Sequence, residues 1–169
     1  MSIDRLPPQS IEAEQSVLGA LLIDKDAVTE VAELLKPDDF YRGNHGDIYA
    51  AILELFNHNQ PIDIVTVSEA LERQEKLDQV GGSAYLTSLI NLTPTAVNVV
   101  HYARILERKS VLRKLIISAG NIAGYAYAED GDVSEVIDKA QSELFAVSQN
   151  RLSSGFDTLS DELLSAYDR

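Results

Sequence analysis

Residues 98–149 decide the fold of this chain, and they read NVVHYARILERKSVLRKLIISAGNIAGYAYAEDGDVSEVIDKAQSELFAVSQ. Their apolar residues recur at alternating steps of three and four, which is the spacing of a helix with one narrow apolar stripe. The pattern predicts two long antiparallel helices, over residues 99–128 and 133–147. Because a narrow apolar stripe needs a partner, we expect the helices to pack side by side as a hairpin. The predicted seam comprises Ile105, Leu112, Ala119, Ile137 and Leu144.

The segment between the two predicted helices has the residues of a turn. Gly131 suits a tight reversal, and Asp132 with Glu135 three residues later is a start signal for the second helix. The first arm is rich in Arg and Lys, and the second in Asp and Glu. Opposite charges favour the antiparallel pairing, although each exposed pair contributes only ~0.2–1 kcal/mol. Two helices alone bury little surface, so the hairpin needs a further layer, from the rest of the chain or from a second copy.

The rest of the chain completes an all-α architecture. Residues 1–93 predict a compact multi-helix globular head, because apolar residues follow helical spacing in short segments separated by Pro, Gly and Asp. Four polar residues are expected to begin helices as N-caps: Ser10, Asn44, Thr66 and Ser83. The helical hairpin follows over residues 94–149. Residues 150–169 predict a polar linker and a short final helix.

The final helix has an apolar face without an obvious partner, formed by Leu159, Leu163 and Tyr167. Its pattern is still running when the sequence stops at Arg169, so the helix has no stop signal. The simplest interpretation is that the chain is a fragment, and that this face docks on a part of the protein that the sequence does not include.

Composition excludes several classes of protein. At 169 residues the chain holds one domain of ordinary size, or a compact domain with an appendage. It has no cysteine, which excludes disulfide frameworks and thiolate metal sites. No stretch approaches the ~18–20 apolar residues of a membrane span, and we expect a soluble, cytoplasmic protein with no membrane partner. The net charge of −13 opposes general nucleic-acid binding, which depends on cations at the phosphates.

The search for catalytic and cofactor sites is negative. The chain has no G-x-x-x-x-G-K-[ST] sequence, so no Walker-type nucleotide site is predicted. His45, His58 and His101 have no second histidine at helical spacing, which favours a capping or helix-surface role over metal or acid–base chemistry. Glu12 and Glu14 are two residues apart and are expected to point to different faces of a helix. We therefore predict an interaction module without catalytic, cofactor-binding or metal-binding residues.

Two features indicate where that module makes contact. Tyr85 lies near the start of a predicted helix, where a tyrosine is more often half-buried core than a docking residue. In the hairpin, apolar residues cover more than one stripe: Leu115, Ile116, Ile117, Ile122 and Ala123. Since one stripe packs against the other arm, the excess predicts a second contact, with the head or with another protomer.

Several short motifs, read together, resemble a known family. They are LPPQSIEAEQSVLG at 6–19, DFY at 39–41 with His45, PID at 61–63 with TV at 66–67, GGSAYL at 81–86, and Asn98 with YARI at 102–105. Each motif is weak alone. Their order and spacing over nearly the whole chain resemble the N-terminal domain of bacterial replicative DNA helicases of the DnaB type, with its linker helix. The RecA-like ATPase domain of that family is absent from this sequence.

The resemblance implies a collar domain of a hexameric helicase. The full protein would unwind duplex DNA at the replication fork with ATP and Mg²⁺, which the ATPase domain would bind and this chain would not. The N-terminal domains would assemble from dimers to a hexamer, dock primase and meet a helicase loader, while DNA contacts the full-length ring and hardly this chain. The implied primase and protomer interface comprises Glu12, Tyr85, Ile116 and Ile122. The implied linker-helix contact, with a neighbouring subunit, comprises Leu159, Leu163 and Tyr167.

Two other functions compete with the collar. A stand-alone helical adaptor or loader of the replication machinery would share this fold, but the unfinished final helix argues against it. A small hydrolase or metal enzyme has no constellation of residues to support it.

Overall fold

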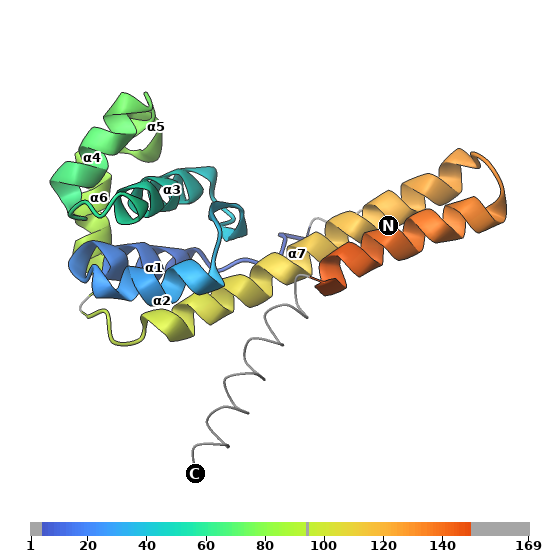
Figure 1. Ribbon diagram of the computed structural model, residues 1–169, viewed down its shortest axis with the longest axis horizontal. Coiled ribbons are helices and arrows are strands. Elements are labelled where there is room, and N and C mark those ends of the chain that lie inside the picture. The colour runs from blue at the N-terminus through green and yellow to red at the C-terminus, as the bar shows by residue number, and fades with distance from the viewer. Residues whose placement is uncertain (1–4, 94, 150–169) are drawn as a thin grey trace, which may run out of the picture. The chain divides into compact units, whose positions relative to one another are not determined.

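The computed structural model describes residues 5–93 and 95–149, and the structural statements below concern those residues. Their regular elements are all helical, as predicted, and none of the described residues forms a strand. Two compact units divide the chain, Met1–Ser110 and Val111–Arg169. The first is the head, and the second contains the hairpin (Figure 1). The division falls inside a long helix rather than at residue 93.

The head is a cluster of short helices (Figure 1). Its elements are α1 (Ile11–Ile23), α2 (Asp26–Leu34), η1 (Pro37–Asp39), α3 (Gly43–Asn57), α4 (Ile64–Arg73), α5 (Leu77–Val80), α6 (Gly82–Leu92) and the first part of α7 (Val99–Ala128). Helix α3 contacts α1, α2, η1, α4 and α5. Helix α1 contacts α2, α3 and α6. Most of its residues are buried, and a helix that is apolar on nearly all sides must be covered by its neighbours.

The core of the head is filled by aliphatic and aromatic side chains from α1, α3 and α6. The largest fully buried ones include Leu18, Leu21, Tyr49, Ile52, Leu86 and Leu89. Gly19 brings α1 and α6 close together, because a Cβ at this position would overlap the Thr93 side chain and the Leu89 carbonyl. This close approach places the C-terminal end of α6 beside the second half of α1.

The head extends beyond residue 93 because α7 begins inside its core. Val99, Ala103 and Leu106 of α7 are buried there. One turn later, the Ser110 hydroxyl donates a buried hydrogen bond of 2.7 Å to an Asp39 carboxylate oxygen. The other carboxylate oxygen of Asp39 accepts from the Lys36 backbone N–H at 2.7 Å. These contacts make the first part of α7 a structural element of the head.

The predicted N-caps are correct at one helix and shifted at the others. Ser10 caps α1, and its hydroxyl accepts from the Ala13 N–H at 3.2 Å. Helix α3 begins at Gly43, one residue before the predicted cap Asn44. Helix α6 begins at Gly82 and not after Ser83, because Gly81 supplies the preceding left-handed turn with φ +111°.

The prediction for α4 had the correct residue in the wrong role. Asp63 is the N-cap, and its carboxylate accepts from the Thr66 N–H at 2.9 Å. Thr66 completes this capping box by accepting from the Asp63 N–H at 3.0 Å. An aspartate cap is at least as favourable as a threonine cap, which explains the earlier start of the helix.

Tyr49 provides a test of the packing of the head. It is fully buried, its hydroxyl donates to the Leu35 carbonyl at 2.8 Å, and burial, followed by the nearby Asp39 charge, raises its pKa. We expect Tyr49→Phe to lower the free energy of unfolding by about 1 kcal/mol, because the carbonyl loses its donor while the ring remains. Urea unfolding followed by circular dichroism measures this, and an unchanged midpoint would show that the bond adds no stability.

The helices match the predicted ranges closely, since α7 spans Val99–Ala128 and the second arm is helical over residues 133–149. The first arm of the hairpin is shorter than predicted, because it is only the α7 segment from Val111. The two arms run antiparallel (Figure 1). In the turn, Gly131 has φ +84°, a left-handed conformation that favours glycine and confirms its predicted role.

The predicted seam requires correction. Ile105 lies in the head unit and is half-buried. Leu112 lies in the second unit and is also half-buried, whereas Ala119, Ile137 and Leu144 are exposed. Ile137 keeps 50% and Leu144 keeps 48% of its surface accessible. The less exposed hairpin residues form a neighbouring stripe on each arm: Ser118, Ile122, Tyr125, Val136, Ala140, Glu143 and Val147.

The seam was misplaced because a heptad pattern shows which residues share an apolar helix face but does not show which surface packs against that face. Polar contacts select the observed pairing. The Tyr125 hydroxyl donates to the Glu143 carboxylate at 2.7 Å, and the Asn121 amide donates to the same group at 3.4 Å. The apolar stripe that contains Ile137 and Leu144 therefore stays at the surface.

Candidate functional site

A buried acid–base pair lies in the head between α1 and α3. Glu14 and His45 are both fully buried, and His45 Nδ1 lies 2.8 Å from a Glu14 carboxylate oxygen. The same carboxylate accepts from the backbone N–H of Tyr41 at 2.7 Å and of Arg42 at 3.3 Å. Burying a carboxylate is costly unless it is paired and hydrogen-bonded, and these three donors meet that requirement.

The other side of His45 faces Tyr85 of α6. His45 Nε2 lies 2.6 Å from the Tyr85 hydroxyl, and the two rings are stacked with their centroids 5.9 Å apart. On the α5–α6 turn, a Cβ at Gly81 would lie 2.8 Å from the Tyr85 Cβ, so only glycine allows this close approach. Tyr85 is half-buried, as predicted for a tyrosine near a helix start, and it is the surface end of the chain Glu14–His45–Tyr85.

Glu12 borders the same part of the head surface. It is exposed in the first turn of α1, one turn before Gln15. The Gln15 amide donates to the Tyr85 hydroxyl oxygen at 3.5 Å. Residues three apart share a helix face, so Glu12, Gln15 and Tyr85 form one surface region, which we call the head face.

Sequence analysis missed Glu14 and misjudged His45. His45 is neither a cap nor on the helix surface, since it is fully buried between two side-chain partners. A signal was available, because Glu14 is four and seven residues before Leu18 and Leu21, on the apolar face of α1. An acidic residue on such a face predicts a buried partner, although its identity lies in another part of the sequence.

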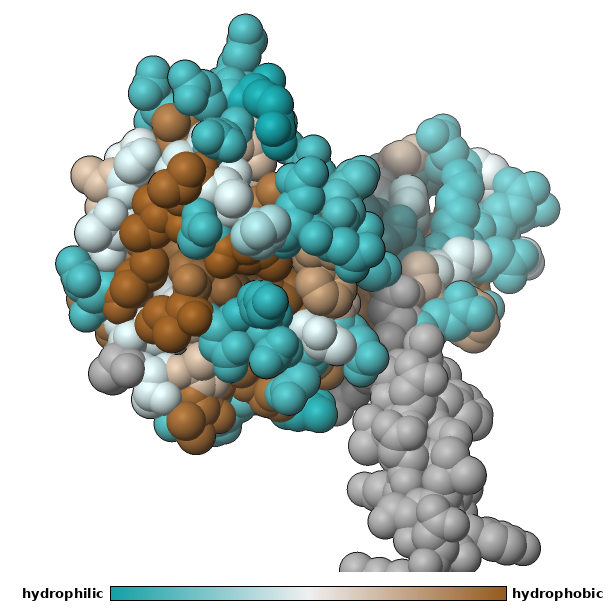
Figure 2. All heavy atoms as spheres, turned by 60° about the vertical axis from the view of Figure 1, so that its left-hand side comes forward, coloured by the Kyte–Doolittle hydropathy of each residue, from teal (hydrophilic) through white to brown (hydrophobic). Residues whose placement is uncertain are grey.

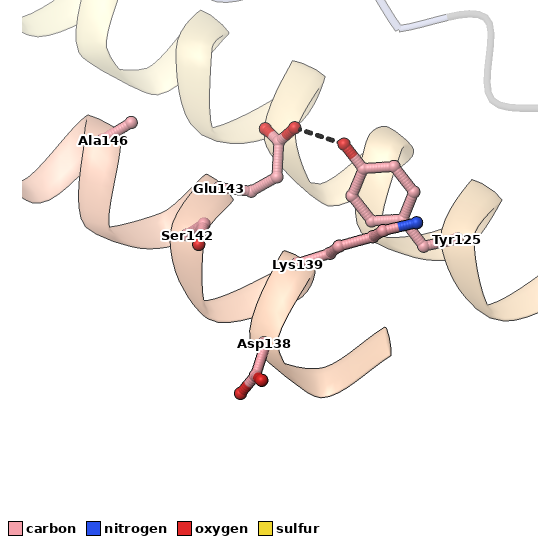
Figure 3. Close-up of a pocket in the computed structure, with 6 residues that line it drawn as sticks. All are labelled: Tyr125, Asp138, Lys139, Ser142, Glu143 and Ala146. Carbon is pink, nitrogen blue, oxygen red and sulfur yellow. Dashed lines mark hydrogen bonds between the residues drawn. The ribbon is translucent and has the colours of Figure 1, made fainter. Parts of the chain in front are cut away.

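A second polar cluster lies between the arms of the hairpin. Tyr125, Asp138, Lys139, Ser142, Glu143 and Ala146 line a pocket of about 390 Å³ (Figure 3). The Lys139 ammonium lies 5.7 Å from the centre of the Tyr125 ring. The bond from the Tyr125 hydroxyl lowers the pKa of Glu143, with further help from Asn121, and the bond to Glu143 raises the pKa of Tyr125.

These shifts predict how the pairing of the arms depends on pH. The lowered pKa of Glu143 means that its contribution is present above the ordinary glutamate range and is lost as the pH falls through its folded value. The raised pKa of Tyr125 means that its contribution is present below the ordinary tyrosine range and is lost at higher pH. We expect slowest amide exchange of residues 133–149, corrected for intrinsic rates, between about pH 5 and pH 9. An acid limb of the same size in Glu143→Gln would contradict this assignment.

Apolar side chains are exposed on both arms of the hairpin. Ile116 keeps 56% and Ile117 keeps 63% of its surface accessible, whereas Ile122 is half-buried. The exposed large apolar residues of the second arm are Val133, Ile137, Leu144 and Phe145. Large exposed apolar side chains along both arms are typical of a protein–protein contact. We call Ile116, Ile117, Ile137 and Leu144 the hairpin stripe.

The head also has apolar surface. Figure 2 shows apolar atoms gathered on one of its faces, among polar ones. Exposed apolar side chains of the head include Ile23, Val65 and Leu92. Of the predicted interface residues, Glu12 and Tyr85 thus lie together on the head, and Ile116 and Ile122 belong to the other compact unit.

The predicted linker-helix contact residues Leu159, Leu163 and Tyr167 lie outside the described residues. Within the part of the chain that the structure describes, no group of three or more His, Cys, Asp or Glu residues is placed to hold a metal ion. None of the described helices is long and apolar enough to cross a membrane.

Comparison with known sequences identifies relatives of this chain. Residues 6–108 match the family described as DnaB-like helicase N terminal domain. The chain is 44% identical over 165 residues to the replicative DNA helicase DnaC of Bacillus subtilis, and the match covers 98% of this chain and 36% of that protein. It is 45% identical over 161 residues to the replicative DNA helicase DnaB of Mycobacterium leprae, covering 94% of this chain and 27% of that protein. The chain thus spans about a third of the length of these relatives.

Solved structures agree with the sequence comparison. The N-terminal domain of DnaB helicase from Mycobacterium tuberculosis is similar with a TM-score of 0.80 and 46% identity, over 84% of this chain and 99% of that one. A DnaB-like replicative helicase, whose structure was described with its primase interactions, is similar with a TM-score of 0.69 and 26% identity, over 89% of this chain and 35% of that one. Fold, family match and relatives agree, and this chain therefore belongs to the DnaB-like helicase N-terminal domain family.

Proposed function

We propose that this chain is the non-catalytic collar of a hexameric replicative DNA helicase, which assembles with copies of itself and docks primase. The observation that carries the proposal is the hairpin stripe, whose four large apolar side chains each keep about half or more of their surface exposed in the single chain. In a family of ring-forming helicases, the simplest cover for such a stripe is another protomer. The family match favours this function over a stand-alone adaptor or loader.

Self-association is supported by the heptad pattern itself. The pattern predicted a helix–helix seam at Ala119, Ile137 and Leu144, yet these residues are exposed. A stripe with coiled-coil spacing is suited to packing against a further helix. We infer that the partner helix belongs to a second copy, so that dimers form first and a hexameric ring follows.

Primase docking is proposed at two surfaces, the head face with Glu12 and Tyr85, and the hairpin with Ile116 and Ile122. A DnaB-like relative whose structure was described with its primase interactions supports the identity of the partner. On the head face, an acidic residue borders a half-buried aromatic ring. Aromatic residues with a polar rim are typical of the energetic centre of a protein interface.

The motor activity is proposed for the full-length protein only. ATP and Mg²⁺ binding, DNA unwinding and contact with a helicase loader would belong to the complete ring in the bacterial cytoplasm. Leu159, Leu163 and Tyr167 would connect the collar to a neighbouring subunit. None of these activities requires a catalytic residue in the head or the hairpin.

The primase part of this proposal is tested by isothermal titration calorimetry. The helicase-binding domain of the primase from the same organism is titrated into the chain, and into the variants Tyr85→Ala and Ile116→Asp. We expect saturable binding by the unchanged chain and weaker binding by each variant. Absence of binding by the unchanged chain would overturn primase docking. Equal binding by all three proteins would show that the docking site includes neither Tyr85 nor Ile116.

A further inference from the structure

The hydroxyl of Tyr85 is turned into the head. It lies 2.6 Å from His45 Nε2, and the His45 ring lies between it and Glu14. Tyrosine is common at interfaces because its ring offers apolar area while its hydroxyl remains available for a partner. Here that hydroxyl is already engaged within the protein.

The chemistry of the carboxylate fixes the first of these two contacts. A carboxylate only accepts, so the hydrogen in the contact between Glu14 and His45 is on Nδ1. In a neutral ring Nε2 accepts from the Tyr85 hydroxyl, and in a doubly protonated ring Nε2 donates to the hydroxyl oxygen. In both forms of the ring, Nε2 holds the Tyr85 hydroxyl. The Tyr85 hydroxyl oxygen also accepts a hydrogen bond from the Gln15 amide at 3.5 Å.

We propose that His45, which Glu14 holds in place, is a positioning residue for Tyr85: its ring holds the Tyr85 hydroxyl inward, so that the head face presents a fixed ring to the docking partner. The inference rests on the proposed docking of a protein at this face. It adds two buried residues to the site and excludes a hydroxyl-directed contact with the partner. The stacked His45 ring and the close Gly81 backbone restrict the Tyr85 ring in the same way.

Variants of His45 separate its two contacts. An asparagine amide can occupy the place of Nδ1 and donate to Glu14, but it does not extend to Tyr85. A glutamine amide can occupy the place of Nε2 and accept from Tyr85, but it loses the contact with Glu14. We therefore expect His45→Gln to preserve the position of Tyr85 better than His45→Asn does.

Binding to the primase helicase-binding domain is measured for Tyr85→Phe, His45→Asn, His45→Gln and the double variant Tyr85→Phe with His45→Asn. Loss of one neutral hydrogen bond predicts that Tyr85→Phe and His45→Asn each bind about 2- to 10-fold more weakly. The double variant should bind no more weakly than the weaker single variant, because both changes remove the same bond. His45→Gln should bind within about 2-fold of the unchanged chain.

Tyr49→Phe is the matched control. It also removes a buried tyrosine hydroxyl from the head, at a bond to Leu35 that does not belong to the head face. If lower stability alone weakened binding, Tyr49→Phe would have the same effect as Tyr85→Phe. We expect it to leave primase affinity unchanged, and an equal loss in both variants would overturn the positioning role.

A spectroscopic measurement on the chain without partner separates this inference from the proposed function. Nitrogen-15 NMR of the His45 side chain distinguishes hydrogen on Nδ1 alone from the other tautomer and from the doubly protonated ring. We expect hydrogen on Nδ1, and a changed Nε2 signal in Tyr85→Phe. Hydrogen on Nε2 with none on Nδ1 would overturn the positioning of Tyr85 even if primase binds. The expected tautomer in a chain that does not bind primase would overturn the proposed docking and leave the position of Tyr85 confirmed.

Discussion

Replacing Glu14 with alanine is expected to lower the stability of the head by about 3–5 kcal/mol, the usual cost of removing one partner from a buried pair. The carboxylate accepts from His45 Nδ1 and from the backbone N–H groups of Tyr41 and Arg42. Alanine would leave all three donors without that acceptor, and the side chain of one of them, His45, is fully buried. It would also release the segment that leads into α3. Because these donors come from two parts of the chain, the loss should affect the head as a whole.

The effect of Glu14→Ala is measured by urea unfolding at neutral pH, with helicity as the signal. Glu12→Ala is the matched control, because Glu12 is an exposed glutamate in the same helical turn. Surface substitutions of this kind usually change stability by less than about 0.5 kcal/mol. A loss below about 1 kcal/mol for Glu14→Ala would mean that water replaces the missing carboxylate. The buried pair would then not be an essential part of the head.

Charged substitutions in the hairpin stripe should have the second largest effect. We expect Ile116→Asp and Ile137→Asp each to weaken self-association by about tenfold or more, because a buried isoleucine contributes ~1.5–3 kcal/mol and 1.4 kcal/mol corresponds to a factor of ten. Both side chains are half-exposed or more in the single chain. The fold of the protomer should therefore tolerate the charge, and only the contact between protomers should suffer.

Analytical ultracentrifugation measures the association constant of each variant, and circular dichroism checks that helicity is kept. Ser142→Asp is the matched control, because Ser142 is exposed on the second arm and two residues from Leu144, so it faces another direction. It introduces the same charge and should leave association unchanged. Equal weakening by all three variants would indicate general charge repulsion. Unchanged association in the two isoleucine variants would place the protomer contact outside the hairpin stripe.

The parts of the fold that depend on local sequence were predictable. Ser10 is a favourable N-cap before an apolar helix, and Gly131 is the one residue of its turn suited to a left-handed backbone conformation without strain. The two long helices were located nearly to the residue, because helical periodicity and turn residues act over short distances. Thr66 was assigned the wrong role for a related reason, since Asp63 three residues earlier makes a competing cap.

The parts that depend on distant residues were not predictable from local patterns. The partners of Glu14 lie 27 to 31 residues away, and Tyr85 meets His45 across 40 residues. The hairpin seam failed similarly, because the interaction of Tyr125 with Glu143 crosses the turn and competes with the apolar stripe. Glu12 and Tyr85 were associated with the interface by resemblance alone. The structure adds a contact between Tyr85 and Gln15, which lies one turn after Glu12 on α1.

The central claim is that this domain assembles with copies of itself. Multi-angle light scattering of the chain over a range of concentrations tests this claim most directly. The single chain has a mass of 18.6 kDa. If the hairpin stripe is covered by a second protomer, the measured mass rises with concentration to that of a dimer and then toward a hexamer. A mass of 18.6 kDa at every concentration would contradict assembly through this domain. The hairpin stripe would then be free for a different protein.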